Sequence, residues 1–175
     1  MFKLLIIDID GVMTDGTKTY DESGKAVYKN FNDLDFTAIK LFKQLGVKVC
    51  FLSGDININE NMARERNIDF WHAKTKDNKL DKTKFIKLFI EKYSVQEDEM
   101  AYIGDDIFDI EMCKRIKESY CPRNASEFLK PFVKTVLNED GGHGVILELL
   151  IKYIQMTGIY HGLHDAILRL IENDQ

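Results

Sequence analysis

Apolar runs that end in polar residues recur along the chain and predict its strands. Residues 4–7 are all apolar, which is typical of a central parallel strand covered on both faces, and Asp8 and Asp10 follow closely. Residues 47–52 and 100–103 show a similar pattern and also lead into polar side chains. We therefore expect buried strands with polar groups at their carboxyl ends.

The intervals between these strands carry apolar residues at helical spacing. Helices are predicted over residues 33–45, 57–66, 80–93 and 110–117, and a helical tail over about 145–172 is interrupted at Gly158. In the helix over 80–93, the side chains of Phe85, Leu88 and Phe89 are predicted to be buried. Shorter strands are predicted near residues 68–71, 119–121 and 135–137. Strands alternating with helices predict an α/β fold with a doubly wound parallel sheet.

A β-hairpin is predicted within about residues 12–31, after the first strand. Residues 17–20 and 26–31 form its two arms, and turn-forming residues separate them. The arms carry large aromatic side chains, including Tyr20, Tyr28 and Phe31. Because a two-stranded hairpin is marginal by itself, we expect it to pack on its own domain or on a neighbouring subunit.

Composition narrows the class of protein. A chain of 175 residues is long enough for one domain with a proper core, so we expect a single domain over residues 1–175. The net charge of −5 argues against nucleic acid as a main partner. The start of the chain resembles neither a signal peptide nor a membrane span, so a cytoplasmic protein is expected. Cys50, Cys113 and Cys121 lack metal-type spacing and suit reduced, mostly buried thiols.

The polar groups after the strands are the candidate chemistry. They are Asp8 and Asp10, then Ser53, then Asp105, Asp106 and Asp109. In a parallel sheet the carboxyl ends of the strands share one edge, so these groups are expected to converge there. Several carboxylates at one point form an oxygen site that suits Mg²⁺. With a hydroxyl and a loop lysine, Lys79, such a site suits a phosphoryl group, and an aspartate can be its nucleophile.

Other interpretations of these residues stay open at this point. The first acidic pair could belong to a surface turn, and Ser53 could be a cap. Asp106 and Asp109 could simply begin the next helix, where acidic residues suit the helix dipole. Lys74, Lys76 or Lys82 could replace Lys79 as the phosphate ligand.

Four ordered segments resemble the motifs of the haloacid dehalogenase phosphatases. They are residues 8–12, Ser53, Lys79 and residues 104–109. The resemblance implies a Rossmann-like sheet in which Asp8 is the nucleophile and Asp10 the acid and base. It implies that Ser53, Gly54 and Lys79 bind phosphate. It also implies that Asp8, the Asp10 carbonyl and Asp105 bind Mg²⁺, with Asp106 or Asp109 in support.

The hairpin and the segment Gly141–Gly142–His143–Gly144 are similar to the capless branch of that family. This branch includes phosphatases of 3-deoxy-D-manno-octulosonate (KDO) 8-phosphate and of nonulosonate, or sialic-acid-type, 9-phosphates. The resemblance implies a small-molecule sugar phosphate as substrate and a homotetramer with no cap domain. Asp55 resembles the nonulosonate enzymes, so both substrate classes stay open. The candidate specificity residues are Asp55, Arg64, Arg66 and His143.

Two other function classes compete with a phosphatase. A phosphoacceptor signalling domain also uses an acidic Mg²⁺ pocket and a lysine, but its phosphorylated aspartate follows a middle strand of the chain. A catalytically silent domain kept for assembly would not need the complete acidic set. Both alternatives predict no turnover of a phosphate ester with Mg²⁺.

Overall fold

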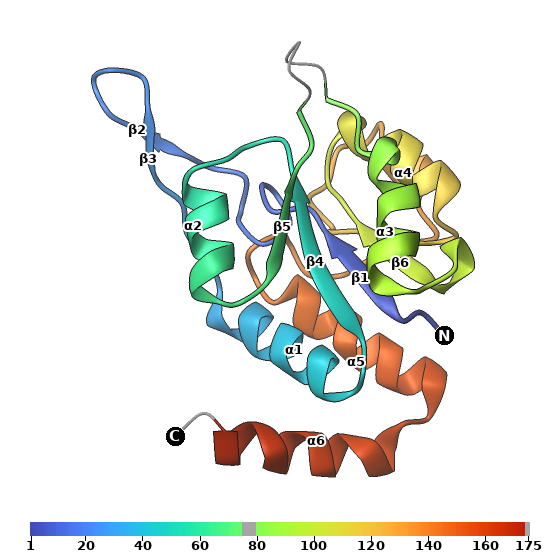
Figure 1. The fold of residues 1–175 in the computed structure, drawn as a ribbon. Coiled ribbons are helices and arrows are strands. Elements are labelled where there is room, and N and C mark those ends of the chain that lie inside the picture. Colours follow the sequence, from blue (N-terminus) through green and yellow to red (C-terminus); the bar gives the residue numbers. More distant parts are fainter. Residues whose placement is uncertain (75–79, 174–175) are drawn as a thin grey trace.

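The computed structural model describes residues 1–74 and 80–173, and within them one parallel sheet organises the fold (Figure 1). This sheet has six strands in the order β5-β4-β1-β6-β7-β8, and every neighbouring pair in the described part of the chain is parallel. The strands are β1 Leu4–Ile7, β4 Lys48–Ser53, β5 Asp69–His72, β6 Met100–Ile103, β7 Glu118–Cys121 and β8 Thr135–Val136. The predicted parallel α/β fold is confirmed.

Helices cover both faces of the sheet. They are α1 Asp33–Gln44, α2 Ile58–Glu65, α3 Ile86–Tyr93, α4 Ile110–Arg115, α5 Val145–Thr157 and α6 Tyr160–Asn173. Short 3-10 turns occupy Thr83–Phe85, Glu97–Glu99, Ile107–Asp109 and Lys130–Phe132. In Figure 1, α1 and α5 lie on one face and α3 and α4 on the other, while α6 packs outside on α1. The sheet is therefore wound on both sides, as the order of elements predicts.

Alternation along β1 explains why this strand is wholly apolar. Leu5 and Ile7 belong to the core cluster that includes α1 and α5, whereas Leu4 and Ile6 belong to the cluster that includes α3 and α4. All four side chains are fully buried. Burying each one contributes about 1.5–3 kcal/mol. A polar residue inside β1 would face one of the two cores, so polar chemistry is confined to the end of the strand.

The helix predicted over residues 80–93 begins later than expected. The chain first makes the 3-10 turn Thr83–Phe85, where the Asp81 side chain accepts a hydrogen bond from the Thr83 amide, and α3 begins at Ile86. Ile86 and Phe89 face the core, as the spacing of three requires. The prediction that Leu88 is buried was wrong, because it lies on the outer face of α3 and is 39% exposed.

The predicted hairpin forms between β2 Thr19–Tyr20 and β3 Ala26–Tyr28, with strands shorter than the sequence pattern. It projects away from the sheet near the carboxyl ends of the strands (Figure 1). Tyr20 and Tyr28 are 59% and 72% exposed, whereas Phe31 packs against Phe36 with ring centroids 5.9 Å apart. The segment after the hairpin is thus anchored on the domain, while the two tyrosines of its strands are exposed within the described chain.

The helical tail and the cysteines also match what the sequence predicts. The break at Gly158 is confirmed, because this residue ends α5 with φ +67°, a conformation that glycine adopts without strain. Cys50, Cys113 and Cys121 are free and buried, as predicted. None of the helices in the described part of the chain is both long enough and apolar enough to cross a lipid bilayer.

Candidate active site

A cavity of about 620 Å³ opens at the carboxyl edge of the sheet. The loops after β1, β4 and β6 meet there because Ile7 at the end of β1 pairs with both Phe51 and Ile103. Its lining includes the predicted residues Asp8, Asp10, Ser53, Gly54, Asp55, Asp105, Asp106 and Asp109. The convergence expected from the parallel topology is therefore present in the structure.

The backbone fixes Asp8 directly at the end of β1. The Asp8 amide donates a hydrogen bond to the Ile103 carbonyl at 2.9 Å, which continues the ladder with β6 by one residue. The Asp8 side chain accepts a hydrogen bond from the Ile9 amide at 2.7 Å. Beyond it, Gly11 has φ +83°, and a Cβ at this position would lie only 1.9 Å from an Asp105 carboxylate oxygen. Glycine is needed there because the loop passes against the acidic cluster.

Asp109 shapes the loop that carries the other acidic residues. One of its carboxylate oxygens accepts hydrogen bonds from the amides of Asp105 at 2.9 Å and Asp106 at 3.1 Å. Asp106 in turn caps the 3-10 turn by accepting from the Ile107 amide at 2.7 Å. Asp106 thus begins the turn, as the interpretation of these acids as helix-starting residues expects, and both Asp106 and Asp109 also line the cavity.

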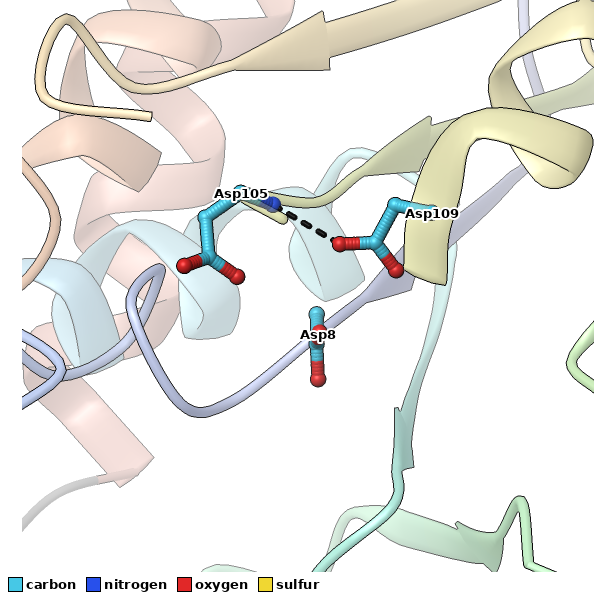
Figure 2. Close-up of side chains that lie close together, drawn as sticks. All are labelled: Asp8, Asp105 and Asp109. Carbon is cyan, nitrogen blue, oxygen red and sulfur yellow. Dashed lines mark hydrogen bonds between the residues drawn. The ribbon is translucent and has the colours of Figure 1, made fainter. Parts of the chain in front are cut away.

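Asp8, Asp105 and Asp109 form an acidic cluster (Figure 2). One carboxylate oxygen from each lies within 4.8 Å of the others. Within the described chain, no hydrogen bond reaches the carboxylate oxygens of Asp105, and Lys82 is the cation that contacts Asp8 and Asp109. A cluster of three carboxylates with one ammonium is short of positive charge. The donor set therefore fits a divalent cation that prefers oxygen ligands.

Among the described residues, Lys82 is the lysine that contacts this cluster. Its ammonium lies 2.5 Å from an Asp8 oxygen and 2.6 Å from an Asp109 oxygen, and it donates to the Tyr102 hydroxyl at 3.0 Å. Tyr102 passes a hydrogen bond to Asp109 at 2.6 Å. The predicted ligand Lys79 lies outside the described residues, and Lys82 is one of the alternatives that the sequence left open.

Burial and repulsion shift the titration of the cluster. Burial raises the pKa of Asp8 to about 7, although Lys82 opposes the shift. Burial and the charges of Asp8 and Asp109 raise the pKa of Asp105 to about 8. Burial has the same tendency at Asp109, but Lys82 outweighs it and lowers the pKa of that carboxyl. Although burial opposes it, the two aspartates raise the pKa of Lys82. The Lys82 ammonium lies almost equally close to Asp8 and Asp109, and without a bound cation Asp8 and Asp105 hold protons more readily than free aspartates do.

Magnesium is expected to stabilise the protein more as pH rises from about 6 to about 8.5. The pKa values of Asp8 and Asp105 are raised in the folded state, so ionising these two carboxyl groups is harder there than in the unfolded chain. The metal-free protein therefore loses folding stability as pH rises toward 8. A divalent cation that binds the cluster displaces these protons, so the affinity for Mg²⁺ is expected to rise up to about tenfold per pH unit for each proton released. Melting temperatures with MgCl₂ and with EDTA across this range measure the effect. A gain that is independent of pH would contradict it.

A second network surrounds Asp10. One Asp10 oxygen lies 2.7 Å from the Lys29 ammonium, in an ion pair whose angles are not those of a hydrogen bond, and the other accepts from the Asn59 amide at 3.0 Å. Lys18 and Lys29 both donate to Asp55, at 2.9 and 2.8 Å. Although burial opposes the shift, these hydrogen bonds lower the pKa of Asp55 to about 2. Asp10, in the loop after β1, is therefore connected through Lys18 and Lys29 to the hairpin strands.

Sequence reasoning missed Lys18, Lys29 and Asn59 in this network. A lysine beside an exposed hairpin strand is usually a solvated charge, and the contacts of Lys29 reach 26 residues along the chain to Asp55. The available signal was the position of Lys18 and Lys29 at the two ends of the hairpin arms, where antiparallel pairing brings them together.

Ser53 lies at the end of β4 with its hydroxyl turned into the site. Its oxygen accepts hydrogen bonds from the Asp55 amide and the Asn59 side chain, each at 3.1 Å. The residue is almost completely buried, with 1% of its surface exposed. Because both contacts use the oxygen as acceptor, the hydroxyl proton remains to be donated.

Three predicted specificity residues lie elsewhere and are absent from the described lining of the cavity. Arg64 donates to Asn61 on α2, and Arg66 lies over the Phe36 ring, 4.1 Å from its centroid. His143 contacts the Gly141 carbonyl within its own loop. Their roles toward a substrate stay predictions.

The glycine-rich loop, residues 141–144, packs against the loop that follows β1. The Gly142 amide donates to the Val12 carbonyl at 2.8 Å, and a Cβ at Gly141 would lie 1.9 Å from the Gly11 carbonyl oxygen. At the end of this loop, Asp35 of α1 accepts from the Ile146 amide at 2.8 Å and so holds the start of α5. Backbone packing of this closeness leaves no room for side chains between the loops.

Comparison with known proteins agrees with this geometry. Residues 59–149 match the haloacid dehalogenase-like hydrolases. The chain is 31% identical over 156 residues to the 3-deoxy-D-manno-octulosonate 8-phosphate phosphatase KdsC of Haemophilus influenzae, covering 89% of this chain and 84% of the relative.

Solved structures extend the likeness to the whole fold. The cobalt-bound deoxy-D-mannose-octulosonate 8-phosphate phosphatase from Haemophilus influenzae superposes with a TM-score of 0.81 at 29% identity, covering 91% of this chain and 92% of that one. The 3-deoxy-D-manno-octulosonate 8-phosphate phosphatase from Moraxella catarrhalis has the same fold, with a TM-score of 0.82 at 22% identity over 97% and 93% of the two chains. The chain belongs to the haloacid dehalogenase-like hydrolase family, and it is a phosphatase.

Proposed function

We propose that this chain hydrolyses the phosphate monoester of a 2-keto-3-deoxy sugar acid, of the KDO 8-phosphate type, with Mg²⁺ as cofactor. The observation that carries the proposal is the meeting of Asp8, Asp105 and Lys82 at one cavity, where a nucleophile, a cation site and an ammonium are side by side. The activity named for the Haemophilus influenzae relative supports the substrate class.

The reaction has two steps that use the same two aspartates. In the first, an Asp8 oxygen attacks phosphorus and the bond from phosphorus to the ester oxygen breaks, while Asp10 gives a proton to the departing sugar hydroxyl. In the second, water attacks the aspartyl-phosphate and Asp10 takes its proton, so that inorganic phosphate leaves and Asp8 is restored. Ser53, Gly54 and a lysine bind the phosphate oxygens throughout.

The metal-binding residues in this proposal are Asp8, the Asp10 carbonyl and Asp105, with Asp106 or Asp109 in support. Bound Mg²⁺ supplies positive charge for the phosphate oxygens. The shortage of positive charge in the acidic cluster supports this assignment. The Haemophilus influenzae structure is a cobalt-bound form, which supports a divalent cation in that relative.

A nonulosonate 9-phosphate is the second candidate substrate, and one observation favours it. Asp55 lines the cavity with a carboxylate that Lys18 and Lys29 hold in place. A fixed carboxylate is a good acceptor for the hydroxyl groups of a longer sugar chain.

We also propose one domain over residues 1–175 and a homotetramer, in which a neighbouring copy covers the exposed Tyr20 and Tyr28.

Phosphate release from KDO 8-phosphate, a nonulosonate 9-phosphate and glucose 6-phosphate tests the proposal. Each substrate is assayed with MgCl₂ and again after EDTA treatment and readdition of metal. We expect hydrolysis that requires the metal and is at least about tenfold faster on one sugar acid phosphate than on glucose 6-phosphate. Equal weak rates on all three would indicate a general phosphatase, and no release would favour a silent domain. Sedimentation of the purified protein tests the tetramer.

A further inference from the structure

Lys29 lies at the centre of a polar network that sequence motifs do not predict. It directly follows β3, and its side chain is only 1% exposed. Its ammonium lies 2.7 Å from Asp10, 2.8 Å from Asp55 and 2.8 Å from the Asn59 side-chain oxygen. Two of its hydrogen bonds go to Asp55 and Asn59, and the contact with Asp10 is an ion pair without hydrogen-bond angles. The buried ammonium is thus compensated by two carboxylates and one side-chain oxygen.

The lining of the cavity separates Lys29 from the substrate. Asp10 and Asp55 line the cavity, but Lys29 and Asn59 are not among its described lining residues. The Lys29 side chain is 1% exposed, so it offers almost no surface to a phosphate ester in the cavity. An effect of Lys29 on the reaction is therefore expected to act through its partners Asp10, Asp55 and Asn59.

We propose that Lys29 is a positioning residue that fixes the orientation of the Asp10 carboxyl group, an inference that rests on the proposed function. Lys29 holds one oxygen of Asp10 while Asn59 holds the other, so rotation of the carboxyl group is restrained at both ends. Proton transfer requires a carboxyl oxygen to point at the reacting oxygen, and a small misplacement can cost about a hundredfold in rate.

The arrangement also gives the hairpin a role within its own chain. Lys18 precedes β2 and Lys29 follows β3, so the two ammonium groups lie at the base of the hairpin. Both contact Asp55 and both lie beside Asp10, Lys18 at the longer distance of 3.5 Å. The hairpin base thus joins the loop after β1 to the loop after β4.

Leaving-group dependence distinguishes positioning of Asp10 from a general structural role. An alkyl phosphate, such as a sugar phosphate, has a strongly basic leaving oxygen that needs a proton as its bond to phosphorus breaks. The leaving group of p-nitrophenyl phosphate needs little protonation. A misplaced Asp10 should therefore slow kcat/KM for the sugar phosphate much more than for the aryl phosphate.

The experiment measures kcat and KM for both substrates in the wild type and in Lys29→Met, which removes the ammonium and keeps the length. We expect kcat/KM for the sugar phosphate to fall about 10- to 100-fold more than for p-nitrophenyl phosphate, mainly through kcat. Asn59→Ala should show the same selectivity at smaller size. Lys3→Met serves as the matched control, because it removes an exposed lysine just before β1 that pairs with Glu99 on the surface away from the cavity.

Equal losses of kcat/KM on the sugar phosphate and on p-nitrophenyl phosphate in folded Lys29→Met would overturn the proposal. If Lys29→Met fails to fold, the double variant Lys29→Met/Asp55→Asn, which loses one carboxylate together with the ammonium, is tested by the same ratio. Failure of both to fold would also overturn it, because Lys29 would then serve folding rather than orientation. Lack of wild-type activity on every phosphate ester would instead contradict the proposed function.

Discussion

Asp8→Asn is expected to abolish turnover of every phosphate ester while the protein stays folded. The amide has no carboxylate oxygen with which to form an acyl phosphate, so the loss should be at least about a thousandfold. Asp8 is fixed at the end of β1 by the Ile103 carbonyl and the Ile9 amide, and backbone contacts of the first kind survive the substitution. Phosphate release under MgCl₂, followed to the limit of detection, measures the effect.

The same variant should be at least as stable as the wild type at about pH 8 without metal. Burial raises the pKa of Asp8 to about 7, so charging this carboxyl costs folding free energy that the neutral amide avoids. Asp98→Asn, at an exposed acidic position just before β6, is the control for loss of one negative charge. Unchanged turnover in folded Asp8→Asn would remove the nucleophile assignment, whereas lost turnover in Asp98→Asn would indicate a general charge effect.

Strand positions and the converging loops were predictable because they follow from hydrophobic pattern and parallel topology. A strand buried on both faces, such as Leu4–Ile7, leaves polar chemistry only at its end. Parallel neighbours then bring Asp8, Ser53 and Asp105 to one edge. The late start of α3 was not predictable from periodicity, because Lys82 turns inward to the acidic cluster and the chain makes a 3-10 turn before the helix can begin.

Contacts that join segments far apart in sequence had no local signal. Lys29 looks like any lysine at the end of an exposed strand, yet it is buried against Asp10, Asp55 and Asn59. The burial of Asn59 in the polar helix α2 also has no sequence signal, since polar residues in a short helix usually face solvent. A search for charged residues at the base of the hairpin would have raised Lys18 and Lys29 as candidates.

Comparison of Lys82→Met with Lys79→Met should assign the phosphate-binding lysine, and Lys82→Met should also destabilise the protein strongly. The Lys82 side chain is 2% exposed and its ammonium contacts Asp8 and Asp109. Removing one partner of a buried ion pair costs about 3–5 kcal/mol of unfolding free energy, because the remaining charges lose their compensation. Activity should fall at least about a hundredfold with it.

The pH and metal dependence of this destabilisation provide its internal check. Without the ammonium, Asp109 loses the main influence that lowers its pKa, so protonation of the cluster can relieve repulsion at about pH 6 but not at about pH 8.5. The destabilisation measured by thermal or urea unfolding should therefore grow with pH, and MgCl₂ should restore more stability to Lys82→Met than to the wild type.

Lys79→Met should keep wild-type stability and activity if Lys82 binds the phosphate. The reverse result, full activity in Lys82→Met and loss in Lys79→Met, would give that role to Lys79 and leave Lys82 as a countercharge for the acidic cluster.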